Sequence, residues 1–172
     1  MTHWVFGYGS LIWRPGFSYL TRQQALLRGA HRSLCIYSHT HRGTPELPGL
    51  VFGLMRGGAC RGMAFEVAGE DWDEVLAYLR EREQVSGVYK ESQRVLKLED
   101  GRHVPALTFM VDESHYQFAG RLPLEEQARL VKRSNGQMGA NVDYVLNTVE
   151  HLKEMGIADR HLMDLGALLR ST

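Results

Sequence analysis

A glutamate on the apolar side of a predicted helix is the residue best suited to chemistry. Trp72, Leu76 and Leu79 recur at three- and four-residue spacing, which predicts a helix over residues 71–83 with these side chains buried. Glu83 is the next position on that stripe, four residues beyond Leu79. Burial disfavours a charged carboxylate, so we expect a raised pKa at Glu83, which suits a group that accepts and returns a proton.

The neighbours of Glu83 leave a second interpretation open. Glu81 lies on a flank of the predicted helix and can remain in water, which makes it the weaker candidate for acid/base chemistry. Glu83 itself stands at a helix end, where an ion pair with Arg80 or Arg82 would explain it without catalysis.

A glycine-bearing loop follows the first predicted strand. Its two glycines allow main-chain N–H groups to converge on an anion such as a carboxylate or a phosphate. A dinucleotide-binding fingerprint needs glycine where Ile12 stands, and a nucleophile elbow around Ser10 needs flanking glycines that are absent. An anion cradle and a simple strand-ending turn therefore both remain open. The loop consists of Gly7, Tyr8, Gly9, Ser10, Leu11 and Ile12.

Tyrosines outside the regular apolar stripes are candidate ligand contacts. Tyr89, Tyr116 and Tyr144 lie at element ends or between elements, where a phenol can hydrogen-bond a polar ligand. Ordinary packing is the alternative for each of them.

Histidine and cysteine spacing indicates no metal site. His39 and His41 would share one face of a strand, but no carboxylate or cysteine stands at a supporting spacing. Cys35 and Cys60 are far apart and outside any C-x-x-C motif, so we expect two reduced core thiols and no disulfide scaffold.

The elements that must position these residues fall into two groups. Strands followed by helices indicate an α+β domain, not alternating βαβ units. We expect one domain over 1–172, because this length suits a single core. Short apolar runs predict strands at 4–7, 30–37, 50–55, 62–67, 88–98 and 103–111, the last two joined by a turn. Helical periodicity predicts helices at 71–83, 124–133, 142–155 and 160–169, with Asn141 as an N-cap.

The composition of the chain argues against two classes of partner, nucleic acids and membranes. Lys plus Arg equals Asp plus Glu at 20 each, so the basic footprint that nucleic-acid binding needs is missing and we expect no nucleic-acid partner. No apolar run approaches the roughly 18 residues of a membrane span, and the first residues lack the pattern of a signal peptide. We therefore expect no membrane partner and a cytoplasmic location.

Several motifs match one family pattern in order along nearly the whole chain. They are WVFGYGSLIW at 4–13, HRGTPE at 41–46, PG at 48–49, YL at 78–79 and RE at 82–83, then Gly120, Leu122, Gly136, Gly139, Asn141, Tyr144, Asp159 and His161. With these motifs the chain resembles the ChaC-like γ-glutamylcyclotransferases. One departure is the segment 84–89 after the glutamate, where family members often have a Gly-Gly-Tyr or Gly-Tyr turn.

The resemblance implies a fold and a reaction. The fold would be a small mixed β-barrel with flanking helices and a helical C-terminal third. The activity would be cofactor-free cleavage of glutathione to 5-oxoproline and Cys-Gly, with Glu83 as general acid/base and the loop 7–12 holding the γ-glutamyl group. Tyr116 and Tyr144 are the further substrate contacts that we expect.

Two other functions remain open. One is a cyclotransferase for other γ-glutamyl compounds, and the other is a non-catalytic sensor of a γ-glutamyl metabolite. The glutamate on the apolar stripe favours an enzyme over a sensor. The expected partner is a small molecule, although a non-catalytic binder could also use the same cavity to contact a transport protein. The sequence predicts no oligomeric state.

Overall fold

The chain forms two compact units, which are described separately. The computed structural model describes residues 1–83 and 87–171, so part of the segment after Glu83 lies outside the described residues. The first unit comprises Met1–Ser33 and Gly53–His115, and the second comprises Leu34–Phe52 and the described residues from Tyr116 on. The expectation of a single domain over 1–172 stays a prediction.

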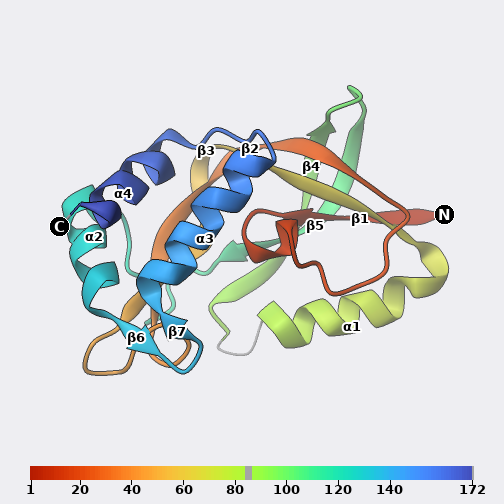
Figure 1. Cartoon of the computed structure of the whole chain (residues 1–172). Coiled ribbons are helices and arrows are strands. Elements are labelled where there is room, and N and C mark those ends of the chain that lie inside the picture. The colour runs from red at the N-terminus through yellow and green to blue at the C-terminus, as the bar shows by residue number, and fades with distance from the viewer. Residues whose placement is uncertain (84–86, 172) are drawn as a thin grey trace. The chain divides into compact units, whose positions relative to one another are not determined.

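A closed barrel lies mainly in the first unit, and only residues 34–38 and 49–52 of its strands are counted with the second unit (Figure 1). Its strands are β1 (Thr2–Gly7), β2 (Thr21–Ser38), β3 (Gly49–Ala68), β4 (Tyr89–Leu98) and β5 (His103–Val111). The order around the barrel is β1-β3-β2-β4-β5. Val5 of β1 lies opposite Phe65 of β3 in an antiparallel pair and opposite Leu107 of β5 in a parallel pair. The barrel is therefore mixed, as the resemblance implied.

Large apolar side chains make up the core of this unit. Phe6, Phe65 and Phe109 are almost fully buried, as are Leu27 and Leu96 on neighbouring strands. Burying a side chain of this size stabilises the fold by about 1.5–3 kcal/mol relative to leaving it exposed. Small barrels are filled by such side chains, so the core is the interior of a packed barrel and not a channel.

The third strand differs from the prediction. The two runs expected at 50–55 and 62–67 belong to one continuous strand, β3. Gly57 and Gly58 lie between them with φ of 99° and 73°, a left-handed conformation that glycine adopts without strain. Glycine inside a strand often marks a bulge or a bend, and here the strand continues through both glycines. β2 is also longer than expected, because it begins at Thr21 instead of residue 30.

The remaining elements of the first unit follow the predictions. β4 and β5 form a hairpin in which Leu98 N–H donates to the Arg102 carbonyl at 2.8 Å, and Gly101 takes a φ of 93° in the turn. Helix α1 (Trp72–Glu83) follows a short 3₁₀ turn over Gly69–Asp71. In Figure 1 this helix runs beside the chain that leads from β1 to β2.

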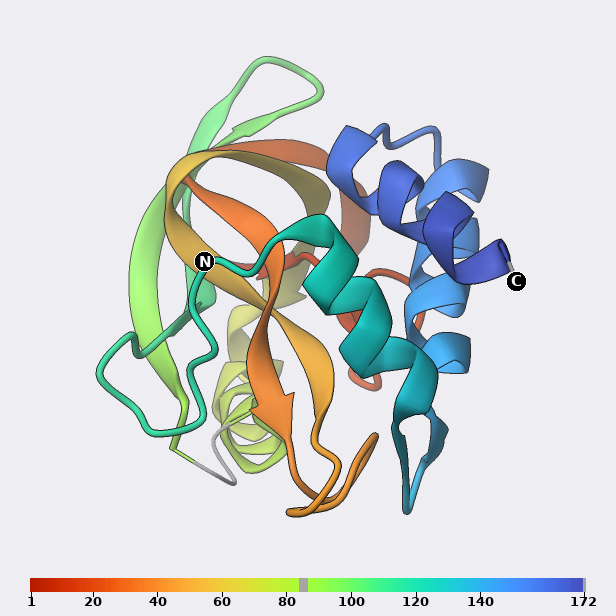
Figure 2. The ribbon, with the colours of Figure 1, turned by 90° about the vertical axis from the view of Figure 1, so that its left-hand side faces the viewer.

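Helices dominate the second unit. They are α2 (Leu124–Arg133), α3 (Asn141–Glu154) and α4 (Arg160–Arg170), with a small hairpin of β6 (Asn135–Gly136) and β7 (Gly139–Ala140) between the first two. Each helix contacts the other two, and Figure 2 shows them gathered side by side. Their facing sides bury Val131, Val149 and Leu165, which accounts for the periodicity seen in the sequence.

Asn141 has a different role from the one predicted. It is the first residue of α3, whose N-cap position is Ala140, and it makes no capping bond. Its buried amide instead accepts a hydrogen bond from Leu50 N–H at 2.8 Å and donates to the Leu50 carbonyl at 2.9 Å. A side-chain amide pairs a backbone N–H and C=O in this way as a neighbouring strand would, so the expectation of an N-cap at Asn141 was wrong.

The cysteines and the helices agree with the remaining expectations from the sequence in part. Cys35 and Cys60 are buried and form no disulfide. Among the described residues, no helix is both long enough and apolar enough to span a membrane.

Candidate active site

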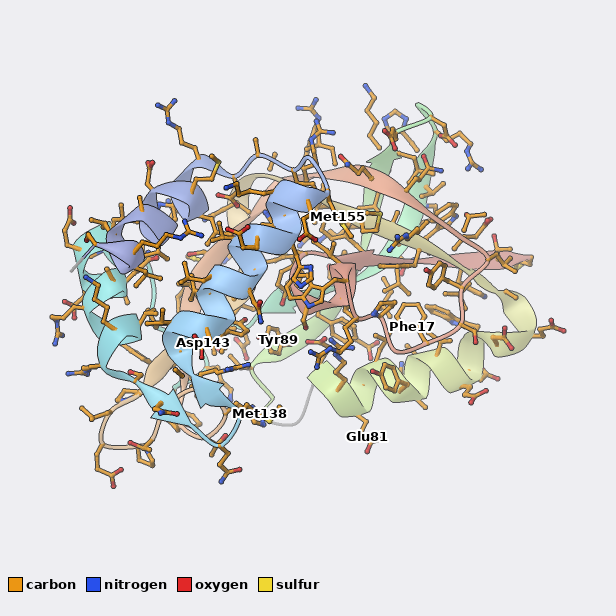
Figure 3. All side chains as sticks on the ribbon, viewed as in Figure 1. Phe17, Glu81, Tyr89, Met138, Asp143 and Met155 are labelled. Carbon is orange, nitrogen blue, oxygen red and sulfur yellow. The ribbon has the colours of Figure 1, made fainter. Side chains whose placement is uncertain are left out.

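Helix α1 directs Glu83 toward the buried side of the first unit. Val75 and Leu79 are buried on this helix, and Glu83 follows Leu79 by one turn, with its side chain 16% exposed. Glu81 is exposed, and in Figure 3 its side chain extends away from the helix into solvent. Of the side chains expected to be buried on this helix, Leu79 is buried, whereas Trp72 and Leu76 are only half-buried. The helix nevertheless turns Glu83 inward and Glu81 outward, as the spacing predicted.

Burial raises the pKa of the Glu83 carboxyl group. Removal of the carboxylate from water raises its pKa above the ordinary 4.5 of a glutamate, and the positive charge of Arg82 opposes the rise without cancelling it. Arg82 Nε lies 3.7 Å from Glu83 Oε1, whereas Arg80 binds Glu91. Of the two ion pairs considered from the sequence, the one with Arg82 is present. Its effect on the pKa of Glu83 is smaller than that of burial.

The Gly7–Ile12 loop forms a tight turn at the end of β1. Residues Ser10–Ile12 make one turn of 3₁₀ helix, closed by Ile12 N–H donating to the Gly9 carbonyl at 2.9 Å. The N–H groups of Ser10 and Leu11 lie at the start of this turn, where helical geometry offers them no partner within the turn. These two N–H groups are the ones suited to hold an anion.

Gly7 and Gly62 lie where the chain passes close to itself. A Cβ atom added to Gly7 would lie 3.0 Å from the Leu11 Cβ, and one added to Gly62 of β3 would lie 2.3 Å from the Gly7 carbonyl oxygen. A side chain at Gly62 would therefore collide with the backbone of the loop, and one at Gly7 would crowd Leu11. Tyr8, Leu11 and Ile12 are buried, while Ser10 is exposed.

Arg82 connects the end of α1 to this loop. Its Nη2 donates to Ser10 Oγ at 2.8 Å, and its Nη1 donates to the carbonyl oxygens of Arg14 at 2.8 Å and Pro15 at 3.2 Å. Arg82 thus contacts both the Gly7–Ile12 loop and Glu83, which lie near each other in the first unit. Sequence reasoning considered Arg82 only as an ion-pair partner, because nothing local marks its contacts with residues some seventy positions earlier.

Arg32 supports the loop from the barrel and was missed entirely. This side chain is buried, with the residue 8% exposed, and its Nε donates to the Tyr8 carbonyl at 2.6 Å. One Nη donates to the Arg61 carbonyl at 2.7 Å. The sequence contained a signal for this inward arginine. Residues two apart on a strand share one face, so Arg32 lies on the same side as Ala30, which is buried.

The other predicted contacts, Tyr116 and Tyr144, belong to the second unit. The Tyr144 hydroxyl accepts a hydrogen bond from Phe52 N–H at 3.0 Å, and the Arg42 guanidinium lies 5.3 Å from the centre of its ring. Tyr116 is 79% exposed and stacks on His39, with 6.3 Å between ring centres. The structure thus gathers Glu83 with the loop in the first unit, while the substrate contacts of both tyrosines stay predictions.

The histidines have partners of other kinds than metals. His3 stacks on Trp72, and His31 Nδ1 is hydrogen-bonded to the Gly57 carbonyl at 2.8 Å. Across residues 1–83 and 87–171, no three His, Cys, Asp or Glu side chains are grouped as metal ligands would be.

Comparison with proteins of known sequence gives one consistent family. A family model described as ChaC-like protein matches residues 3–172. A glutathione-specific γ-glutamylcyclotransferase of Escherichia coli (strain K12) is 33% identical over 162 residues, which cover 94% of this chain and 70% of the relative. Glutathione-specific γ-glutamylcyclotransferase 1 of Mus musculus is also 33% identical, over 165 residues that cover 92% of this chain and 74% of the relative.

Solved structures support the same fold. The crystal structure of a γ-glutamyl cyclotransferase specific to glutathione from yeast superimposes with a TM-score of 0.88 at 24% identity, covering 98% of this chain and 95% of the other. A second structure, of a γ-glutamyl cyclotransferase, gives a TM-score of 0.59 at 15% identity over 97% of this chain and 88% of the other. At these identities the likeness concerns the fold, and it agrees with the barrel and helices found here.

Proposed function

This chain belongs to the ChaC-like protein family, and from that premise we propose that it is a γ-glutamylcyclotransferase that cleaves glutathione. The products are 5-oxoproline and Cys-Gly. The observation that carries the proposal is the buried Glu83 carboxylate, with its raised pKa, tied through Arg82 to the Gly7–Ile12 loop. An acid of this kind suits proton transfer in a reaction that needs no enzyme nucleophile.

The reaction is an intramolecular aminolysis. The α-amino nitrogen of the γ-glutamyl group attacks its own γ-carbonyl carbon, so a new C–N bond closes a five-membered lactam. The amide bond to the cysteine nitrogen breaks. Between the ammonium form of the substrate and the ammonium form of the product Cys-Gly, the attacking nitrogen loses two protons and the leaving nitrogen gains two. No electrons, water or co-reactant enter, so the task of the protein is to hold the γ-glutamyl chain in its bent, reactive conformer.

Glu83 is the group that we propose moves the proton. The substrate α-amine is largely protonated at neutral pH and must lose a proton before it attacks. The Glu83 carboxylate accepts that proton and then protonates the departing nitrogen, and a pKa raised toward neutrality brings its two protonation states closer in energy. Its side chain is only 16% exposed, which limits the access of competing water to the same exchange.

The Gly7–Ile12 loop is the proposed holder of the substrate. Main-chain N–H groups at Ser10 and Leu11 are suited to the substrate α-carboxylate or to the oxyanion that develops on the γ-carbonyl oxygen. Tyr116 and Tyr144 supply phenols for further polar contacts with the γ-glutamyl group.

A cytoplasmic location accompanies this proposal. Glutathione is a cytosolic thiol buffer, and there thiols stay reduced. Two buried cysteines that form no disulfide agree with such a compartment. The balance of 20 basic and 20 acidic residues supports a small-molecule partner over a nucleic acid.

Product analysis tests the function directly. Purified protein is incubated with reduced glutathione, without added metal or nucleotide, and 5-oxoproline and Cys-Gly are quantified. We expect both products in equal amounts, and a parallel incubation with γ-glutamyl-alanine to be much slower. Faster turnover of γ-glutamyl-alanine would favour a cyclotransferase for other γ-glutamyl compounds, and binding of glutathione without product would favour a sensor.

A further inference from the structure

The Arg82 guanidinium has more partners than a surface arginine needs. Besides Ser10 Oγ and the carbonyl oxygens of Arg14 and Pro15, it donates to the Tyr78 hydroxyl at 3.1 Å, and its Nε lies 3.7 Å from Glu83. Its side chain is only 20% exposed. The five donors of a guanidinium have fixed directions, so these contacts define one orientation of the group.

The chain around Arg82 is shaped to admit these contacts. Gly16 takes a φ of 75°, and a Cβ atom at this position would lie 2.1 Å from the Tyr78 hydroxyl oxygen. The segment after the 3₁₀ turn therefore passes directly against α1, where its carbonyl groups meet the guanidinium. Phe17 adds an edge contact to the Tyr78 ring, with 6.4 Å between centres, and Figure 3 shows Phe17 on the segment that runs beside this helix.

Arg80 on the same helix provides the contrast. It is 52% exposed and binds only the Glu91 carboxylate of β4 among the hydrogen bonds of the described residues. A side chain so exposed contributes little beyond a surface ion pair. Two arginines two residues apart thus differ completely in surroundings, and only Arg82 contacts both the loop and the acid.

We propose that Arg82 is a positioning residue for the reaction: its fork holds the Ser10 turn and the Glu83 carboxylate in one fixed arrangement. The inference rests on the proposed role of Glu83 as general acid/base. The geometry requires it to act through other groups, because its donors are already directed to Ser10 Oγ and to main-chain carbonyl oxygens. A shift of about 1 Å between the loop and the acid is enough to cost on the order of a hundredfold in rate.

A second consequence concerns protonation. Burial raises the pKa of Glu83, and the charge of Arg82 opposes that rise, so the arginine keeps the pKa below the value that burial alone would give. Loss of that charge alone therefore raises the pKa further. Because the substrate amine titrates alike with every variant, a change in the acid limb of the profile reports the enzyme's own acid.

Two substitutions separate the charge from the fork. Arg82→Gln removes the charge and keeps a donor, whereas Arg82→Lys keeps the charge and removes the fork. Arg80→Gln is the matched control on the same helix. For each variant, kcat, KM for glutathione and the pH profile of kcat/KM are measured from 5-oxoproline release, with thermal unfolding as a check on folding.

The expected results differ for each variant. Arg82→Gln moves the acid limb of kcat/KM to higher pH by about one unit, the lower end of the effect of an adjacent charge. Arg82→Lys leaves the acid limb near its wild-type position but lowers kcat on the order of tenfold to a hundredfold, because one ammonium cannot hold the hydroxyl and both carbonyls. Arg80→Gln changes neither.

Specific outcomes overturn the inference. The positioning role is ruled out if Arg82→Lys keeps the wild-type kcat. It is also ruled out if Arg82→Gln folds and the acid limb of its kcat/KM profile does not move. If Arg82→Gln does not fold, the kcat of Arg82→Lys decides alone. Glu83→Gln separates this failure from that of the proposed function. If Glu83→Gln keeps wild-type activity, the acid/base role is lost and the Arg82 inference falls with it; if it is inactive, only the Arg82 results bear on positioning.

Discussion

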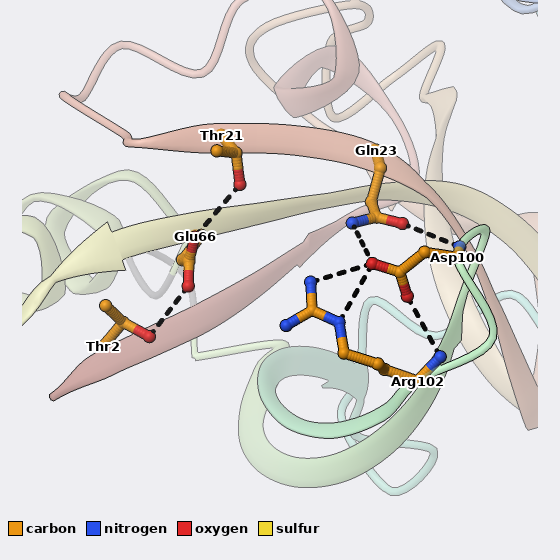
Figure 4. Close-up of polar contacts among 6 residues, drawn as sticks. All are labelled: Thr2, Thr21, Gln23, Glu66, Asp100 and Arg102. Atoms are coloured by element: carbon orange, nitrogen blue, oxygen red, sulfur yellow. Dashed lines mark hydrogen bonds and ion pairs between the residues drawn. The ribbon is translucent and has the colours of Figure 1, made fainter.

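Two carboxylates of the first unit sit beside arginines and behave in opposite ways. Glu83 lies 3.7 Å from Arg82, and both side chains are mostly covered. Asp100, in the turn between β4 and β5, accepts hydrogen bonds from Arg102 Nε at 2.9 Å and from Gln23 Nε2 at 3.2 Å (Figure 4). Its side chain is 43% exposed.

The pKa of Asp100 is lowered and that of Glu83 is raised, because different interactions dominate at the two carboxylates. Hydrogen bonds from the Arg102 side chain and main chain lower the pKa of Asp100 to about 2. No such bonds reach Glu83 among the interactions described, so loss of hydration dominates and its pKa rises. An adjacent arginine therefore does not by itself tell whether a carboxylate is structural or chemical; burial and direct hydrogen bonding decide.

The largest expected difference between the two sites is in activity. Glu83→Gln lowers turnover of glutathione by about two orders of magnitude or more, because the positioned acid/base is lost. Asp100→Asn leaves turnover unchanged, since this carboxylate binds Arg102 within the hairpin turn and Gln23 of β2 and has no contact with Glu83 among the hydrogen bonds described. Both are measured as 5-oxoproline release at saturating glutathione. Equal effects of the two substitutions would contradict the assignment of Glu83.

The packing beneath Glu83 gives the next largest effect. Leu79 is fully buried one turn before it, and Leu79→Ala lowers the free energy of unfolding by about 2–5 kcal/mol through lost contacts and a cavity. Val95→Ala is a control on β4, where the residue is 61% exposed and little changes. Chemical denaturation measures both. A Leu79→Ala loss no greater than that of Val95→Ala would show that α1 is not anchored by this stripe.

The pH dependence of stability should have opposite signs at the two carboxylates. A raised folded pKa means that Glu83 contributes stability below its unfolded value near 4.5, and that this contribution is lost as pH rises through the folded pKa. The effect of Glu83→Gln on unfolding free energy is therefore more favourable at pH 7 than at pH 4.

For Asp100 the folded pKa is lowered, so its contribution is present above its unfolded value and is lost as pH falls toward about 2. Asp100→Asn is accordingly destabilising at pH 7, slightly because the site is exposed, and neutral at about pH 2. Denaturation at several pH values measures both series, and parallel pH trends for the two variants would refute the comparison.

The smallest effect is expected at Glu66, the other acid in Figure 4. Its two oxygens accept hydrogen bonds from Thr2 Oγ1 at 3.0 Å and Thr21 Oγ1 at 3.1 Å, which join three strands at the barrel surface. Glu66→Gln keeps one acceptor oxygen, so we expect a change in unfolding free energy within about 0.5 kcal/mol and unchanged turnover. A large loss of activity would mean that the barrel surface is coupled to Glu83.

Much of the fold could be predicted from local patterns. The helix at 124–133 begins and ends where periodicity placed it, and the hairpin of β4 and β5 follows its Gly101 turn. These features depend on side chains within a few residues of one another, so the sequence contains their physical cause. The inward direction of Glu83 belongs to the same class, because one helical turn relates it to Leu79.

Other features depend on partners that are distant in sequence. β3 continues through Gly57 and Gly58, where His31 of β2 is hydrogen-bonded to the Gly57 carbonyl. The Asn141 side chain pairs with Leu50, which offers both a donor and an acceptor, and does not cap its own helix. No local rule contains either choice, since glycine and asparagine are each compatible with several roles.

The sequence by itself predicted the positions of the helices and the inward direction of Glu83, because helical periodicity acts over a single turn. Only the tertiary structure decided what surrounds that acid: Arg82 reaches across to Ser10, and Arg32 holds the Tyr8 carbonyl from the barrel. A long charged side chain can adopt many directions, and the one it takes depends on which carbonyl and hydroxyl groups folding brings within its reach.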